Sequence, residues 1–169
     1  MRIKTYDFVG ESDYINAVDD IRKYLCFLLD DDYAYDMAIN EAVLNAAQYS
    51  IDGPDNAKIH LEISFTAYDV STKVCCETKS CDMLAYREQL RSIAARPENK
   101  GMDWADYVAD SDGSRGLWYM LGGTEYIIMG HQAQYVCLCT KNPFPRERET
   151  KKMQDLLMRF FVEKDGVLL

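Results

Sequence analysis

The chain has 169 residues, of which 48% are hydrophobic and 28% charged, and its formal net charge at pH 7 is −9. This length predicts one domain, with at most an appended element. The acidic balance argues against direct binding of nucleic acid or of an anionic membrane surface. No segment reaches the roughly 18–20 apolar residues of a membrane span. Since the N-terminus also lacks the apolar run of a signal peptide, we expect a cytoplasmic protein.

The first half of the chain predicts a strand, two helices and a hairpin. Apolar residues recur at helical spacing in the two predicted helices, and the second of them is apolar on most sides, which is typical of a buried helix. After a turn rich in Gly, Pro, Asp and Asn, the apolar residues alternate with polar ones, as in an antiparallel hairpin with one buried face. The predicted elements are a strand over 2–9, helices over 13–29 and 36–50, and strands over 57–66 and 70–77.

The second half begins with a long connection, 78–112, which carries no strand signal and has the length of a functional lid. Within it we expect helices over 83–95 and 102–109. A helix opened by 112–116 and two strands, 125–129 and 135–141, follow. Beyond Pro143 and Pro145, apolar residues at helical spacing predict an amphipathic helix over 146–162. We therefore divide the chain into a domain of residues 1–142 and a C-terminal helical extension of residues 143–169.

Four polar residues lie on one face of the predicted helix 36–50 and just after it: Glu41, Asn45, Gln48 and Asp52. Their spacing of three or four stacks the side chains on one side. On a buried helix such groups must find partners or line a cavity. Oxygen ligands suit a hard cation, and Mg²⁺ typically takes only one or two of them from protein. The alternative is a stripe that simply faces solvent.

A second polar motif opens the predicted helix before 117–121. The segment from Gly113 to Gly116 places two glycines around Ser114 and Arg115. Glycines at a helix start let backbone N–H groups approach an anion, and the helix dipole favours negative charge there. The alternative is an ordinary turn.

These motifs occur in one order: E-A-x-x-N-A over 41–46, a hairpin, a long connection, and G-S-R-G-L over 113–117. The order resembles the GHKL (Bergerat-fold) ATPase superfamily, and most closely the bacterial anti-sigma factor serine kinases. The resemblance covers about residues 3–141. It implies an α+β, two-layer α/β sandwich in which a mixed, mostly antiparallel sheet has helices on one face. The C-terminal helix adds to that pattern.

The resemblance also implies ATP and Mg²⁺ as cofactors and assigns roles to single residues. Glu41 would orient or deprotonate the serine hydroxyl of a partner, and Asn45 would bind Mg²⁺ and bridge it to the nucleotide phosphates. The backbone from Gly113 to Gly116 would hold phosphate, and the position of Arg115 suggests that it adds a charge there. The whole set of expected cofactor-binding residues is Asn45, Gln48, Cys76, Glu77, Gly113, Ser114, Arg115, Gly116 and Leu117.

One element departs from the family pattern, which reads roughly V-x-D-x-G at the end of the second hairpin strand. The Asp of that pattern accepts a hydrogen bond from the adenine amino group. Here the matching stretch begins at Val74, and strand register places Cys76 where the Asp would stand. A thiol is a poor acceptor. Glu77 comes one residue later and therefore points to the opposite face unless a bulge turns it.

Three hypotheses follow. The first is an ATP-dependent serine kinase that regulates a small protein partner of the anti-anti-sigma or sigma-like kind, and that forms a homodimer as its relatives tend to. The second is a degenerate, nucleotide-free member that acts as a protein-binding module, which Cys76 favours. The third is a thiol or metal site made by Cys75, Cys76, Cys81, Cys137 and Cys139. Its alternative is a set of buried core cysteines.

Overall fold

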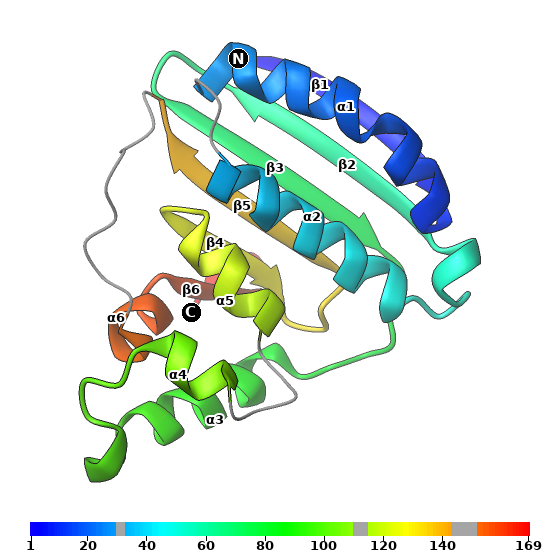
Figure 1. Ribbon diagram of the computed structural model, residues 1–169. Helices are drawn as coiled ribbons and strands as arrows, with labels where there is room; N and C mark the ends of the chain where they lie inside the picture. The colour runs from blue at the N-terminus through cyan, green and yellow to red at the C-terminus, as the bar shows by residue number, and fades with distance from the viewer. Residues whose placement is uncertain (30–32, 110–114, 143–151) are drawn as a thin grey trace.

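The computed structural model describes residues 1–29, 33–109, 115–142 and 152–169, and these form an α+β protein built on one open sheet (Figure 1). The sheet is mixed and mostly antiparallel, and its seven strands follow the order β1-β2-β3-β5-β4-β6-β7. The strands are β1 (Arg2–Val9), β2 (Lys58–Phe65), β3 (Asp69–Cys76), β4 (Tyr126–Gly130), β5 (Tyr135–Lys141), β6 (Phe160–Lys164) and β7 (Val167–Leu168).

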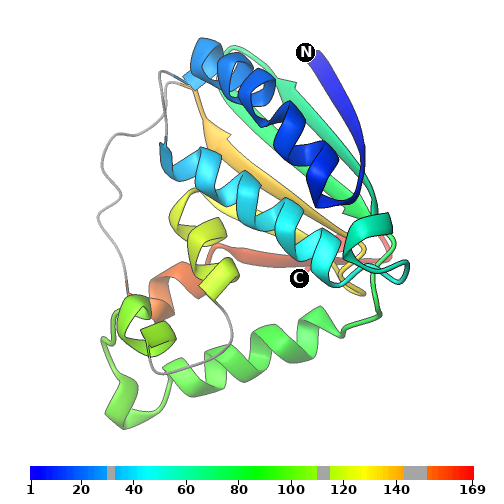
Figure 2. The same ribbon diagram turned by 45° about the vertical axis from the view of Figure 1, so that its right-hand side comes forward.

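Helices cover one face of this sheet. Figures 1 and 2 show three of them, α1, α2 and α5, side by side over that face, with α3 below them. No helix among the described residues is long and apolar enough to cross a membrane. The helices are α1 (Gly10–Leu29), α2 (Tyr33–Gln48), α3 (Met83–Ala94), α4 (Trp104–Ala109), α5 (Arg115–Gly122) and α6 (Met153–Leu157), with short 3₁₀ turns η1 (Pro54–Asn56) and η2 (Pro97–Asn99).

Helix α2 lies at the centre of the core, as its nearly all-round apolar sequence predicts. Ile39 and Val43, one turn apart, are fully buried. Tyr35 is buried as well, and its hydroxyl lies 2.9 Å from Thr72 Oγ1 of β3 and 3.0 Å from the carbonyl oxygen of Leu138 of β5. These contacts fix α2 across the middle strands of the sheet.

The predicted hairpin and the two predicted later strands are confirmed. Strands β2 and β3 form an antiparallel hairpin, and β4 pairs antiparallel with β5. Alternate residues fill the core under the helices, for example Leu61 and Val74, which are register partners and almost fully buried. On the other face Glu62, Lys73 and Cys137 are only half-buried.

The C-terminal segment corrects the predicted helix over 146–162. Residues 143–151 lie outside the described part of the chain, α6 covers only Met153–Leu157, and β6 joins the sheet parallel to β4. Phe160 and Val162 alternate into the core in β6. Phe160 and Phe161 fit helical spacing from Leu156 and Leu157, whereas parallel pairing with β4 makes the segment a strand in which Phe160 and Val162 face inward.

The connection 78–112 contains the two expected helices, although α4 begins two residues later than predicted. Helix α3 is tied to the C-terminal segment by Arg87, whose buried guanidinium donates to the carbonyl oxygen of Phe160 at 3.3 Å and to that of Leu169. The backbone N–H of Met153 also donates to the carbonyl oxygen of Met102 at 3.1 Å. This connection is therefore anchored to the C-terminal part of the sheet.

Candidate functional site

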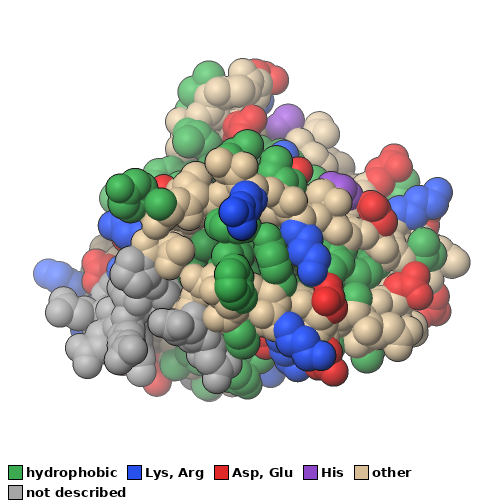
Figure 3. Space-filling view, turned by 90° about the horizontal axis from the view of Figure 1, so that it is seen from above, with side chains coloured by type: hydrophobic (Ala, Val, Ile, Leu, Met, Phe, Trp, Pro, Cys, Tyr) green, Lys and Arg blue, Asp and Glu red, His purple; other side chains and the backbone are tan. Residues whose placement is uncertain are grey.

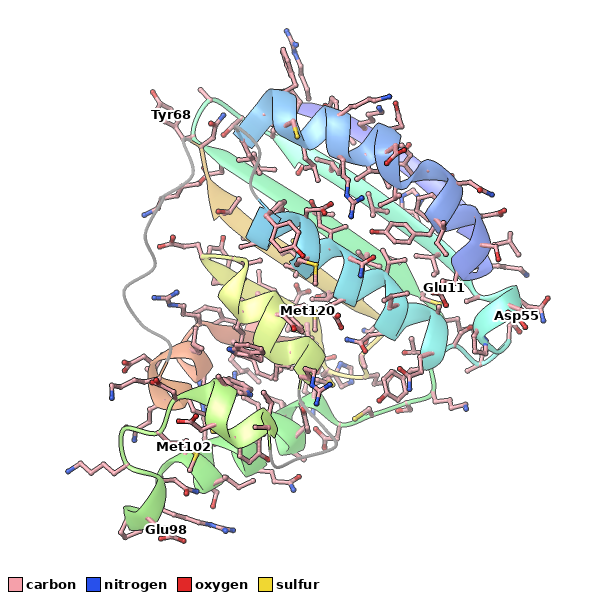
Figure 4. The ribbon with its side chains drawn as sticks, in the orientation of Figure 1. Glu11, Asp55, Tyr68, Glu98, Met102 and Met120 are labelled. Atoms are coloured by element: carbon pink, nitrogen blue, oxygen red, sulfur yellow. The ribbon has the colours of Figure 1, made fainter. Side chains whose placement is uncertain are left out.

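A cavity of about 400 Å³ opens between α2, α5, the end of β3 and the start of α3. That volume lies in the range of small-molecule sites. Most of its wall is apolar. Met120, labelled in Figure 4, lies on α5 where that helix adjoins α2. The lining residues are Ala42, Asn45, Ala46, Tyr49, Val74, Cys76, Thr78, Lys79, Cys81, Met83, Tyr86, Gly116, Leu117, Met120, Met129, Ala133, Gln134, Tyr135 and Val136.

Two motifs that are far apart in the sequence meet beside this cavity. Glu41 and Asn45 lie one turn apart on α2, both half-buried, and Gly116 at the start of α5 packs against them. A Cβ atom at Gly116 would lie 2.6 Å from Asn45 Nδ2 and 3.2 Å from Glu41 Oε2. A glycine here therefore allows α5 to approach the two polar side chains closely. We call Glu41, Asn45 and Gly116 the polar cluster.

The carboxyl group of Glu41 is partly removed from water. This desolvation raises the pKa of Glu41, because burial disfavours the anion, while the positive charge of Arg115 acts in the opposite direction. Arg115 itself is exposed. A carboxylate whose pKa is shifted upwards is a better proton acceptor near neutral pH.

The far wall of the cavity carries Cys76 at the end of β3, only 8% exposed. Burial raises the pKa of its thiol, against the effect of a hydrogen bond from Ser50, so the group is a neutral thiol at pH 7. Its backbone N–H donates to the carbonyl oxygen of Gln134 at 3.2 Å. The expected register is therefore kept, and Cys76 occupies the cavity wall.

The structure brings together only part of the predicted set. Asn45, Cys76, Gly116 and Leu117 line the cavity, and Glu41 contacts the glycine that lines it. Gln48 and Glu77 are exposed and lie outside the lining. Gly113 and Ser114 lie outside the described residues, so their phosphate-binding role stays a prediction.

Sequence reasoning missed the floor of the cavity. Met129 and Val136 are register partners in β4 and β5, and both line it together with Met120. The sequence predicted the two strands but not which of their residues face the core. The position of the cavity above these residues depends on how distant helices pack on the sheet. No sequence signal marks that position.

The cysteines give the thiol hypothesis little support. All six carry free thiols. Cys137 Sγ and Cys139 Sγ lie 3.7 Å apart on the face of the sheet opposite Cys76. Among the residues that the structure describes, no group of three or more His, Cys, Asp or Glu side chains is placed to hold a metal ion.

No family model matches the chain, and no curated protein matches it significantly. The site is therefore argued from its own geometry.

Proposed function

We propose that the chain binds ATP and Mg²⁺ in this cavity and acts as an anti-sigma-factor-like regulator that phosphorylates a serine of a small partner protein. The observation that carries the proposal is the polar cluster. It joins a carboxylate, a carboxamide and a close glycine at a cavity of suitable volume. Two polar side chains held beside a mostly apolar cavity are typical of a ligand site with few, well-placed polar contacts.

Each member of the cluster has a role in this proposal. The carboxamide oxygen of Asn45 would bind Mg²⁺, which keeps its other positions for phosphate oxygens and water. When bound there, the ion would neutralise charge on the phosphates. Glu41 would orient the serine hydroxyl and accept its proton. Phosphoryl transfer depends mainly on positioning and charge stabilisation, which are the contributions that these groups would supply.

The arrangement of elements supports a Bergerat-type, two-layer fold as the scaffold. Helix α2 carries the polar residues over the sheet, α5 begins beside it, and residues 78–86 border the cavity between them. Strands β6 and β7 extend the sheet beyond the part of the chain that the family resemblance covers.

The surface is compatible with a protein partner. Seen from above, hydrophobic side chains emerge between basic and acidic ones (Figure 3). Tyr68, at the β2–β3 turn in the upper part of Figure 4, is 76% exposed. Mixed surfaces with exposed aromatic side chains are common in protein interfaces.

Calorimetric titration with Mg·ATP tests the binding step. We expect saturable, Mg²⁺-dependent heat that Asn45→Ala abolishes, while Asn40→Ala, on the same helix but outside the cavity lining, leaves it unchanged. Transfer is tested with γ-labelled ATP and candidate partner proteins. Glu41→Gln should still bind nucleotide but transfer no label. Heat that does not depend on Asn45 would contradict the proposal.

A second candidate function is a nucleotide-free binding module, which Cys76 favours because none of the described lining residues offers a carboxylate for an adenine amino group. Absence of heat and of thermal protection at millimolar Mg·ATP would support this candidate and exclude the kinase.

A further inference from the structure

The cavity wall away from the polar cluster is rich in sulfur. Cys76, Met83, Met120 and Met129 all line the cavity and are buried. Methionine side chains are flexible and polarizable, contact aromatic rings favourably, and adjust to groups of different shape. A planar ring can therefore be held here by its faces.

Among the residues that the structure describes, the buried part of this wall lacks the groups that read the edge of a purine. The polar lining residues Lys79 and Gln134 are exposed, and Gln134 Oε1 already accepts from the backbone N–H of Gln132 at 3.0 Å. Among the described lining residues none is Asp or Glu, and the charged one is Lys79. The Cys76 thiol is a weak donor and acceptor. The hydroxyl of Thr78 already donates to the carbonyl oxygen of Ala133 at 3.0 Å.

Selecting adenine requires an acceptor for its amino group, whereas guanine and hypoxanthine present an oxygen at the same ring position. Large selectivity arises when buried polar groups are left unpaired by the wrong ligand. The buried lining side chains that the structure describes end in thioether, thiol or alkyl groups, so they leave no strong hydrogen-bonding group unpaired, whichever base is bound.

We infer that this cavity accepts purine nucleoside triphosphates by apolar contact with the base and does not discriminate adenine from hypoxanthine or guanine. The inference rests on the proposed function, since it assumes that the polar cluster holds the phosphates. It makes Cys76 the residue that determines base tolerance.

The test compares Mg²⁺ complexes of ATP, ITP and GTP with the wild-type chain by calorimetry. We expect dissociation constants within about threefold of one another, because no strong hydrogen bond to the base is gained or lost. ITP differs from ATP in presenting an oxygen in place of the amino group, so this pair isolates the edge contact.

A substitution at Cys76 tests the same point by introducing a preference for ATP over ITP. Cys76→Asp places a carboxylate on the wall and should favour ATP over ITP by at least about tenfold. The matched control Cys76→Ser supplies no charge and should leave the ratio near one. If circular dichroism shows that Cys76→Asp is unfolded, the wild-type comparison alone decides.

The outcomes separate the two proposals. Wild-type binding of ATP at least tenfold tighter than ITP overturns the inference and leaves the proposed function standing. Equal binding of all three nucleotides supports both. Absence of binding by all three overturns both.

Discussion

The close approach of Gly116 to Asn45 predicts that a methyl group added at Gly116 will weaken ligand binding while leaving the stability of the fold nearly unchanged. In Gly116→Ala the new Cβ meets Asn45 Nδ2 at 2.6 Å, far below an ordinary contact. Nδ2 is the end of a flexible side chain, so Asn45 can rotate away without moving either helix. The fold should survive while the carboxamide leaves its position.

The magnitudes follow from that geometry. The amide nitrogen must retreat from 2.6 Å to the roughly 3.4 Å of an ordinary contact, a shift of about 0.8 Å. Loss of a contact that orients a metal ligand typically costs about 10–100-fold in metal affinity or activity, so we expect at least about a tenfold loss of Mg·ATP affinity. Alanine in a helix is favoured over glycine by about 0.5–1 kcal/mol. The free energy of unfolding should therefore change by less than about 1 kcal/mol.

The assay pairs calorimetric titration with urea unfolding, and Gly122→Ala is the matched control. Gly122 lies in the same helix, yet a Cβ there would meet nothing within 4 Å. That variant should keep the nucleotide affinity, and its free energy of unfolding should likewise change by less than about 1 kcal/mol. Unchanged nucleotide affinity in a folded Gly116→Ala protein would refute the reasoning, because it would show that the Asn45 carboxamide is not needed where it lies.

Three further changes test the rest of the account. Arg87→Met leaves the carbonyl oxygen of Phe160 without its donor and should lower the free energy of unfolding by about 2 kcal/mol. Arg96→Met, the control at an exposed residue, should change this free energy little. Equal effects of the two variants would contradict the role of Arg87 in anchoring α3 to the C-terminal segment. Phe160→Ala should cost about 3–5 kcal/mol in urea unfolding if β6 is a core strand, and a cost near zero would return the segment to an appended helix. Because the pKa of Glu41 is raised in the folded protein, the unfolded chain loses this proton first, and the contribution of Glu41 to stability falls as pH rises from the ordinary glutamate pKa to the folded value. Glu41→Gln lacks this loss, so its melting temperature should rise relative to wild type between pH 4 and pH 7, and a constant difference would contradict the desolvation of Glu41.

Sequence patterns predicted most of the fold because most elements have long, unambiguous periods. Ile59, Leu61 and Ile63 alternate through β2, and α2 keeps apolar residues on most sides; the structure places both as predicted. The C-terminal strand was not predicted, because a segment of five residues is too short to show a clear period of two. Phe160 and Val162 become inward positions only through parallel pairing with β4, which is a long-range contact.

The candidate site was predictable in part for the same reason. The spacing of Glu41 and Asn45 placed them on one face, and strand register placed Cys76 on the core side. Gln48 belongs to the same stripe but falls at the end of α2, beyond the cover of α5, and is exposed. Helical spacing predicts on which side of a helix a side chain points, whereas its burial depends on which neighbouring element covers that turn of the helix.

The most direct test of the central claim is where Mg·ATP binds. In an ¹H–¹⁵N spectrum of the labelled chain, we expect Mg·ATP to shift the side-chain amide of Asn45 and the backbone amide of Gly116, with Mg²⁺ required for the full effect. The signals of Lys73 and Cys137, on the opposite face of the sheet, should stay in place. Shifts confined to that face, or none at millimolar nucleotide, would contradict the account.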